Sequence, residues 1–517
     1  MSMTMGAAIT IIIVAGSLLL WGWSFLNWIW LKPKKLEKQL REQGLAGNPY
    51  RLLFGDSKDM ATAIREARSQ SINFSHHIAH RALPSSHLTI NKYGKNCFAW
   101  VGPTPRVYIT DPEQLKTVFS LINDIPKAPL FPPARTPGSG GLVSLEGSKW
   151  AQHRKIINPA FHTQKLKDMF PAFFESCNEM INKWEVMVSE EEEGCFELDV
   201  WPDLQNMTAD SISRTAFGSS YEEGKKIFQF LKTWVSLLVA RLTKGVYNIP
   251  GWRFVPTQMN RKMEEVNREI KSMVWGIISK RQAAMEAAQV SNNADLLGIL
   301  LEENKKDAVG MSMEDIISEC KLFYFAGQET TASLLVWTMV LLGRYSEWQD
   351  RARAEVLDVF GEDKKVDFDG LNRLKVVSMI LYEVLRLYPP VGILARGIHK
   401  ETKLGNLILP GGVSLGIPII HIHHDHQIWG EDADEFKPER FSEGISKATN
   451  NKVCFLPFGW GPRICVGQNF AMIEAKIALS MILQSFSFQL SPSYTHSPAS
   501  NVTVQPQHGA HLILRKL

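Results

Sequence analysis

The sequence lacks the signals of several large classes of protein. Its 6 cysteines include no Cys-x-x-Cys pair, so a zinc site is not indicated. No internal repeat or long low-complexity tract is present, which argues against a fibrous or disordered chain. The formal net charge of +4 is small for 517 residues and gives no reason to expect nucleic acid as a partner.

A nucleotide-binding module is missing as well. No Gly-x-Gly-x-x-Gly fingerprint or flavin-like domain is visible, and a dinucleotide-binding turn requires that glycine pattern. Any electrons that the protein uses are therefore expected to come from a separate chain. The composition, 45% hydrophobic and 21% charged residues, is typical of a folded globular protein.

The N-terminus carries a long hydrophobic run. Residues 6–31 contain no charged side chain and can cross a bilayer, whose core needs about 20 apolar residues in a helix. Tryptophans, which favour the headgroup layer, gather toward its second end at Trp21, Trp23, Trp28 and Trp30. Pro33 is expected to end the helix. Lysines follow at Lys32, Lys34, Lys35 and Lys38, so by the positive-inside rule the bulk of the chain faces the cytosol.

A cleaved signal peptide is the alternative for this segment. It requires basic residues ahead of the apolar run, but residues 1–5 carry no charged side chain, and the run is long for such a signal. We therefore predict an uncleaved anchor at residues 1–32, a basic, proline-containing linker at 33–60 and a folded domain at 61–517. A cytosolic domain is not expected to form disulfides.

One cysteine needs a separate explanation. Cys465 lies in residues 458–467, which contain three glycines and one proline and are expected to form a tightly bent loop. Residues 470–479 follow with helical periodicity. The thiol would then sit at the mouth of a helix, where unpaired N–H groups and the positive end of the dipole favour a thiolate. Arg463 can add positive charge.

A thiolate in this position can be a nucleophile or a metal ligand, and the plainest alternative is a buried structural cysteine. A nucleophile needs a neighbouring base, and the loop contains no histidine. Haem ligation uses every part of the loop. The stretch resembles the haem-binding signature of the cytochromes P450, Phe-x-x-Gly-x-Arg-x-Cys-x-Gly, which is matched at Phe458, Gly461, Arg463, Cys465 and Gly467.

The resemblance implies a haem b cofactor whose iron is held by Cys465. It implies that Phe458 packs against the haem, that Gly467 leaves clearance for it, and that Arg463 binds a propionate, because guanidinium and carboxylate pair well. The other propionate-binding positions of the family are matched at Trp150, Arg154 and Arg396. The first two would otherwise be explained as a packing pair on a helix.

A charged pair is embedded in an apolar helical stretch upstream. Glu383 and Arg386 lie three residues apart and share a helix face; alone, such a pair is usually a surface salt bridge. Apolar surroundings make an unpaired charge costly, so a further partner is expected. The family pattern supplies it in Arg440, and the resemblance implies that the three residues brace the haem-side core without a chemical role.

A long helix is predicted over residues 312–345, opened by a capping box. Its middle contains Ala-Gly-Gln-Glu-Thr-Thr at residues 326–331, which by itself predicts a kink with a polar notch. Placed before the other motifs, it resembles the family's oxygen-activation motif. Thr330 would then hydrogen-bond iron-bound oxygen or a water, and Glu329 would help relay protons. Ala326 and Gly327 would leave space beside the iron of the haem for oxygen and substrate.

The resemblance covers essentially the whole chain after the anchor and implies the mainly α fold of the cytochromes P450, with a small β region. Two strand-forming stretches are visible in the sequence. One covers residues 99–110. The other covers residues 404–417, where Pro410-Gly411-Gly412 is expected to supply the turn of a hairpin.

The function implied is that of an O2-dependent haem-thiolate monooxygenase in the endoplasmic reticulum membrane, with electrons from NADPH through cytochrome P450 reductase. Two other classes stay open. One is a reductase-independent haem-thiolate isomerase or dehydratase, although such relatives tend to lose the acid–threonine pair that is kept here. The other is a non-enzymatic haem-binding membrane protein.

The substrate is expected to be bulky and lipophilic. Five segments that line the pocket in the family are mostly apolar: residues 125–142, 230–242, 322–330, 391–395 and 494–499. Finer similarity to the plant group that contains secologanin synthase is carried by residues 43–51, 441–444 and 505–509. That group includes oxidases of triterpenoids, gibberellins and iridoid glucosides. We expect a terpenoid oxidase, triterpenoid first, with an iridoid or gibberellin oxidase as the alternative.

Overall fold

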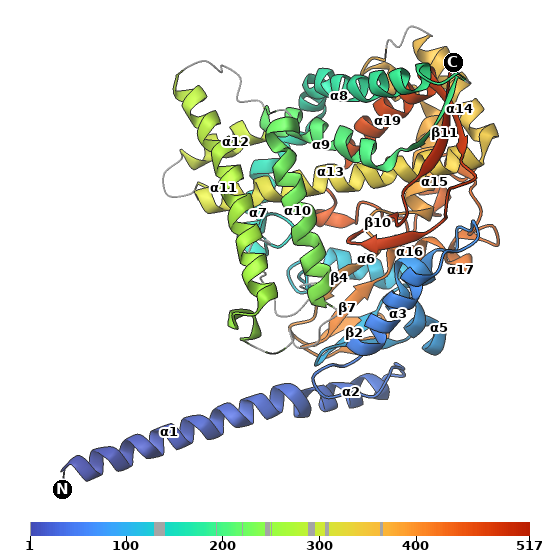
Figure 1. Ribbon diagram of the computed structural model, residues 1–517. Coiled ribbons are helices and arrows are strands. Elements are labelled where there is room, and N and C mark those ends of the chain that lie inside the picture. The colour runs from blue at the N-terminus through green and yellow to red at the C-terminus, as the bar shows by residue number, and fades with distance from the viewer. Residues whose placement is uncertain are drawn as a thin grey trace.

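The computed structural model describes residues 2–128, 140–192, 194–219, 221–242, 249, 251–287, 295–305, 310–361 and 366–517. Figure 1 shows a body of packed helices and small sheets, from which a long N-terminal helix projects. The described α-helices are α1 (Ser2–Leu26), α2 (Lys32–Glu42), α3 (Ser57–Ser69), α4 (Ala79–Ala82), α5 (Pro84–Tyr93), α6 (Pro112–Ser120), α7 (Gly147–Ile157), α8 (Thr163–Ser189), α9 (Trp201–Phe217), α10 (Tyr221–Leu242), α11 (Gln258–Glu286), α12 (Leu296–Asn304), α13 (Met313–Arg344), α14 (Ser346–Phe360), α15 (Lys375–Leu387), α16 (Ile419–His423), α17 (His426–Trp429), α18 (Ile445–Ala448) and α19 (Gln468–Ser485). The strands are β1 (Phe98–Val101), β2 (Thr104–Tyr108), β3 (Cys195–Asp199), β4 (Leu394–Gly397), β5 (Thr402–Leu404), β6 (Leu407–Leu409), β7 (Ser414–Ile417), β8 (Phe486–Leu490), β9 (Pro498–Asn501), β10 (Thr503–Pro506) and β11 (His511–Lys516).

Pro33 does not end the N-terminal helix, so that prediction is wrong. α1 passes through a π-helical turn (Asn27–Leu31) directly into α2. Proline lacks an N–H, and its ring crowds the carbonyl four residues earlier, here that of Ile29. The π turn accommodates the mismatch, and the Tyr50 hydroxyl donates to the freed Ile29 carbonyl at 2.7 Å. Among the described helices, this continuous one is long and apolar enough to cross a membrane.

Replacing Tyr50 by phenylalanine should loosen this joint between the N-terminal helix and the rest of the chain. One hydrogen bond contributes about 0.5–1.5 kcal/mol, so amide hydrogen exchange at residues 27–32 should become roughly 3- to 10-fold faster in the full-length protein held in lipid nanodiscs. Tyr93→Phe is the matched control, because it removes a hydroxyl that donates to Asn48 at 2.7 Å. If exchange in Tyr50→Phe equals that of the control, ring contacts alone hold the joint.

The largest sheet has the strand order β1-β2-β7-β4. β1 and β2 pair as antiparallel strands in the stretch predicted to form strands at residues 99–110, and β7 runs parallel to β2 and antiparallel to β4. The hairpin predicted at residues 404–417 is wrong, because β6 pairs with β5 across Gly405 and Asn406, and β7 pairs with β2 and β4 instead. Gly405 has φ 60°, which allows a short reversal. β7 is buried along its whole length and therefore takes an inner place in the larger sheet.

α13 is the central helix of the body and confirms the helix predicted at residues 312–345. Ser312 caps it by accepting from the Asp315 N–H at 3.2 Å and donates its hydroxyl to the Asp315 carboxylate at 2.7 Å. The helix contacts α9, α15, α19 and β10 (Figure 1). Every side chain from residue 331 to 342 is buried, whereas residues 325–328 are only half-buried. The middle of the helix is thus its less tightly covered part.

Candidate active site

The loop that carries Cys465 turns sharply before α19. Gly461 has φ 72°, and a Cβ there would lie 3.0 Å from the Phe119 carbonyl oxygen, so both conformation and space call for glycine. The Cys465 N–H donates to the Phe458 carbonyl at 2.9 Å and closes the loop. Because α19 begins at Gln468, the thiol lies just ahead of a helix N-terminus, as the sequence predicts.

Cys465 differs from the other five cysteines, all of which the structure describes, in being exposed. Burial nevertheless raises the pKa of Cys465. The hydrogen bond from the Gly467 N–H and the charges of Arg154 and Lys127 lower this pKa, but burial has the larger effect. A thiol can be accessible and yet shielded from bulk water when it faces a space inside the protein. For comparison, burial raises the pKa of Cys454 to about 12, so that thiol stays protonated and unreactive.

Four basic side chains form a cluster that reaches Cys465: Lys127, Arg154, Arg396 and Arg463. The charges of Arg154 and Lys127 act on the thiol, and those of Arg396 and Arg463 act on Lys127. Burial and then the charges of Arg396 and Arg463 lower the pKa of Lys127 to about 7. Burial and the charge of Arg463 lower the pKa of Arg396 to about 10. Glu146 supplies opposing charge: its carboxylate accepts from the Arg463 guanidinium and from the backbone N–H of Lys127. We call these four basic side chains the cation set. Their positive charge exceeds the single negative charge of Glu146, so a bound anion would stabilise them.

The sequence-predicted members of this set also contact one another. The Arg463 guanidinium lies over the Trp150 ring, 4.3 Å from its centroid, and Arg154 donates to the Ile464 carbonyl at 2.7 Å. Lys127 was missed by the sequence reasoning. It lies in an irregular segment after α6 and belongs to no motif, so only its position in space reveals it.

The Glu329 carboxylate is held by three side chains from two separate elements. Thr503 and Gln505 of β10 donate to its Oε1 at 2.8 and 3.2 Å, and Gln205 of α9 approaches its Oε2 at 3.5 Å. These partners are all neutral. Burial therefore raises the pKa of Glu329, and the hydrogen bonds oppose that effect. Sequence reasoning found Glu329 but none of its partners.

Thr330 and Gly327 occupy the same helix segment with different roles. The Thr330 hydroxyl donates to the Ala326 carbonyl at 2.7 Å, the local bond that such a residue makes in place of a purely regular ladder. Gly327 was expected to leave space beside the haem, and the structure gives another reason for it. A Cβ there would lie 2.7 Å from a side-chain atom of Ile212, so glycine permits the close approach of α9 to α13.

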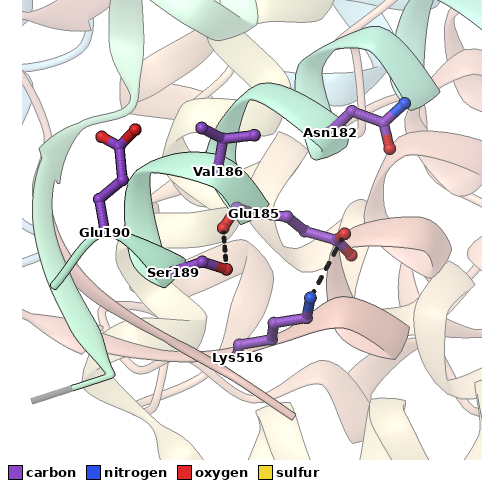
Figure 2. A pocket seen from close by; sticks show the side chains of 6 residues that line it. All are labelled: Asn182, Glu185, Val186, Ser189, Glu190 and Lys516. Atoms are coloured by element: carbon purple, nitrogen blue, oxygen red, sulfur yellow. Dashed lines mark hydrogen bonds and ion pairs between the residues drawn. The ribbon is translucent and has the colours of Figure 1, made fainter. Parts of the chain in front are cut away.

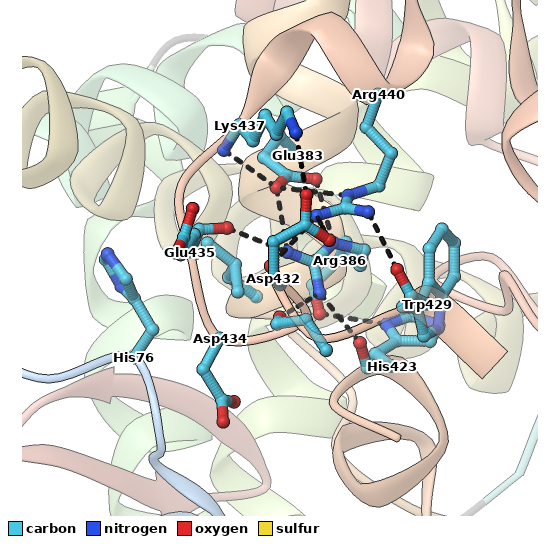
Figure 3. Close-up of polar contacts among 12 residues, drawn as sticks. His76, Glu383, Arg386, His423, Trp429, Asp432, Asp434, Glu435, Lys437 and Arg440 are labelled. Atoms are coloured by element: carbon cyan, nitrogen blue, oxygen red, sulfur yellow. Dashed lines mark hydrogen bonds and ion pairs between the residues drawn. The ribbon is translucent and has the colours of Figure 1, made fainter. Parts of the chain in front are cut away.

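Glu383 and Arg386 form a fully buried pair with further partners (Figure 3). Arg386 donates from Nε and Nη2 to the two Glu383 oxygens at 2.8 and 2.7 Å. Its N–H groups also reach backbone carbonyls of His423, Ala433 and Glu435 at 2.9, 2.6 and 3.0 Å. The Arg440 Nε lies 3.7 Å from Glu383, farther than its Nη2 contact with Asp432 at 3.0 Å. Arg440 is thus the outer member of the predicted cluster.

His423 connects this cluster with the cysteine loop. Its Nε2 accepts from the Leu456 N–H at 2.9 Å, two residues before Phe458, so the proton is on Nδ1, which lies 3.0 Å from the Arg386 carbonyl. Burial lowers the pKa of His423 to about 3, which keeps the ring neutral. Sequence spacing alone does not reveal this role, because the partners of His423 lie 37 and 33 residues away along the chain. Across the described residues, no group of His, Cys, Asp and Glu is arranged to hold a metal ion.

With this geometry in hand, comparison with known proteins decides the family. A family model described as Cytochrome P450 matches residues 76–513. The chain belongs to the cytochrome P450 family. A relative from Glycyrrhiza uralensis, 11-oxo-beta-amyrin 30-oxidase, is 54% identical over 100% of this chain and 99% of its own length. Cytochrome P450 72A397 from Kalopanax septemlobus is 54% identical over 96% of each chain.

The fold of this P450 is matched by a solved structure. That of retinoic acid bound cyanobacterial CYP120A1 has a TM-score of 0.73 at 22% identity and covers 86% of this chain and 97% of that one. The predicted mainly α fold with a small β region is therefore confirmed. Cytochromes P450 are haem monooxygenases whose iron is held by a cysteine thiolate, so this P450 is an oxidoreductase with haem as its cofactor.

The residues that the structure brings together fit a haem. An accessible thiol lies ahead of a helix N-terminus, where the Gly467 N–H and the charges of Arg154 and Lys127 favour its thiolate form against burial. The cation set around it would bind the two propionates, and the buried Arg463 Nε has no hydrogen-bond partner among the described residues. A buried N–H without a partner is costly, and a propionate oxygen could accept a hydrogen bond from it.

A surface hollow lies elsewhere, between the end of α8 and β11 (Figure 2). It is lined by Asn182, Glu185, Val186, Ser189, Glu190 and Lys516. Lys516 pairs there with Glu185 at 3.6 Å, and such solvent-accessible ion pairs contribute little to stability. The hollow contains none of the predicted site residues and is no candidate for the reaction.

The predicted substrate pocket of this P450 is described only in part. Residues 129–139, in the first of the five expected segments, lie outside the described residues, as does the side chain of residue 242 in the second. The other three segments are described throughout. Their role in binding substrate stays a prediction.

Proposed function

We propose that this P450 is a membrane-anchored oxidase of triterpenoids. The observation that carries the proposal is 54% identity, over the whole chain, with a protein named 11-oxo-beta-amyrin 30-oxidase. The apolar character of the expected pocket segments suits such a substrate. Residues 1–32 would anchor the chain in the endoplasmic reticulum membrane, residues 33–60 would link the anchor to the domain, and residues 61–517 would form the cytosolic catalytic domain.

In this proposal the cofactor is held from two sides. Cys465 ligates the iron through its thiolate, with Phe458 packed against the ring and Gly467 leaving clearance. The propionates are bound by the cation set and its stacked tryptophan, Lys127, Trp150, Arg154, Arg396 and Arg463. Haem supplies the oxidising chemistry with O2, and NADPH–cytochrome P450 reductase supplies the electrons.

Protons are handled by Glu329 and Thr330 of α13. The Glu329 carboxyl is buried among neutral donors, so it can hold a proton more readily than an exposed carboxylate and release it again. The Thr330 hydroxyl donates its proton to the Ala326 carbonyl. The lone pairs of the hydroxyl oxygen can therefore accept a hydrogen bond from a water. Retention of both residues favours a monooxygenase over a reductase-independent isomerase.

Replacing Thr330 by alanine should separate reductant use from product formation. Loss of a proton-handling hydroxyl typically costs about 100-fold or more in a catalysed step, so we expect product formed per NADPH to fall at least roughly 10-fold while NADPH use continues. Thr338→Ala is the matched control, because Thr338 makes the same local bond on the same helix, to the Leu334 carbonyl at 2.8 Å. Equal coupling in the two variants would remove the role assigned to Thr330.

The substrate proposal is tested with the full-length protein, reductase and NADPH in microsomes. β-Amyrin-type triterpenoids, a gibberellin precursor and an iridoid glucoside are offered in parallel, and products are analysed by mass spectrometry. We expect an oxidised triterpenoid that forms only with NADPH. Turnover of another member of the panel without the triterpenoids would overturn the substrate class, and product formed without NADPH would contradict monooxygenation.

A further inference from the structure

A carboxyl group without a cation lies where four helices meet. Glu474 stands about two turns into α19 and is fully buried. Neither of its oxygens makes a hydrogen bond of normal geometry within the described part of the chain, and the Thr331 hydroxyl beside it is also unpartnered there. The hydroxyls of Thr331 in α13 and Ser211 in α9 act on the carboxyl closely enough to lower its pKa. The Cys177 thiol of α8 is close enough for the charge of Glu474 to raise the pKa of that thiol.

The surroundings favour the neutral form of this carboxyl. A buried carboxylate needs a cation or several strong donors, and here two hydroxyls stand in their place. Burial outweighs them and raises the pKa of Glu474 to about 8. A protonated carboxyl can donate and accept at once, and hydroxyl groups rotate to suit it. Small side-chain rotations would therefore complete bonds between Glu474 and the two hydroxyls without moving a helix.

We propose that Glu474 is a positioning residue which, as a neutral acid, joins α19 to α9 and α13 and so fixes the start of α19 behind Cys465. The placement of its neighbours supports this role. α19 begins three residues after Cys465, and Thr331 directly follows Thr330. One proton on Glu474 thus lies between the helix that follows the thiolate and the helix that carries the proton-handling pair. The role in fixing Cys465 rests on the proposed iron ligand.

Loss of that proton should disturb the joint. The folded-state pKa of Glu474 is raised above its ordinary value, so its stabilising effect is present at low pH and is lost as pH rises through about 8. The groups that face it are the Cys177 thiol, whose pKa burial also keeps raised, and the two neutral hydroxyls. None of these groups is a cation that could pair with an ionised Glu474. The charge would then have to be hydrated, either by water that enters the core or by a separation of the helices.

The protonation state is tested by infrared spectroscopy of the full-length holoenzyme in lipid nanodiscs. At about pH 6, wild type should show the C=O band of a buried, protonated carboxyl that Glu474→Gln lacks, and this band should fade as pH rises past about 8. If the two proteins have the same carboxyl bands, Glu474 is ionised and the proposal is overturned. This readout does not depend on the iron ligand.

The positioning role is tested by the pH dependence of the reduced carbon monoxide spectrum. Wild type should lose its thiolate-type band as pH rises past about 8, and Glu474→Gln, a neutral mimic, should retain it for at least about one further unit. Glu264→Gln makes the same chemical change at an exposed helix position and should behave as wild type. Equal midpoints in wild type and Glu474→Gln would overturn the positioning role, as would a Gln variant that cannot hold haem. Absence of the band from wild type at every pH would instead contradict the proposed function and, with it, the link to Cys465.

Discussion

Replacing Arg386 by alanine should leave little folded, haem-bound protein. The change removes the bidentate partner of a fully buried Glu383 carboxylate and leaves backbone carbonyls without donors. Breaking a buried ion pair on one side typically costs about 3–5 kcal/mol, a large share of the roughly 5–15 kcal/mol that stabilises a folded domain. The haem-to-protein ratio and the midpoint of urea unfolding measure the loss.

Two further variants give this result its meaning. Arg351→Ala breaks an exposed ion pair with Glu439, whose atoms lie 2.6 Å apart, and should change stability by less than about 1 kcal/mol. Removing Glu383 and Arg386 together should cost less than the sum of the single changes, because no unpaired charge remains. Arg386→Ala with the stability of the Arg351 variant would show that the cluster does not brace the core.

Replacing Cys465 by serine should abolish monooxygenase activity and the thiolate-type carbon monoxide spectrum. Serine has nearly the same shape but is a poor ligand for this iron, so the electronic contribution of the thiolate is lost. Because the side chain is exposed and serine is close to cysteine in size, the change creates no cavity in the packed core and should leave the far-ultraviolet circular dichroism unchanged. Product per haem is expected to fall below about 1% of wild type.

Cys195→Ser is the matched control for this substitution. Cys195 is half-buried in β3, away from the loop, so its replacement should preserve both the spectrum and turnover. Were the Cys465 variant to keep the thiolate-type spectrum, another of the six cysteines would have to hold the iron. Four of the remaining five are buried, which makes the predicted contrast between the two variants a sharp one.

Local features of the site could be predicted from the sequence because each is encoded within a few residues. The glycines around Cys465 predict the bent loop, and the apolar neighbours of Glu383 and Arg386 predict that this pair is buried. The cap at Ser312 fixes the start of α13 within one residue. Such signals depend on backbone geometry and helix periodicity, which act at short range.

Features that depend on contacts between distant segments could not be predicted. Lys127 lies in an irregular segment, and only the fold of that segment places it in the cation set. Thr503 donates to Glu329 although the two residues are 174 positions apart in the sequence. The helix through Pro33 survives because the Tyr50 hydroxyl takes up the freed carbonyl. In each case the residue type is compatible with many positions, and the tertiary fold selects one. The turn between β5 and β6 was misplaced for a related reason, since two glycine-containing stretches compete and burial of β7 decides between them.

The carbon monoxide difference spectrum of the reduced full-length protein tests the central claim most directly. If a cysteine thiolate in the loop before α19 holds the iron, the Soret band should lie at the position typical of thiolate-ligated haem. A Soret band at the position typical of histidine-ligated haem, obtained from freshly prepared protein at neutral pH, would contradict the account.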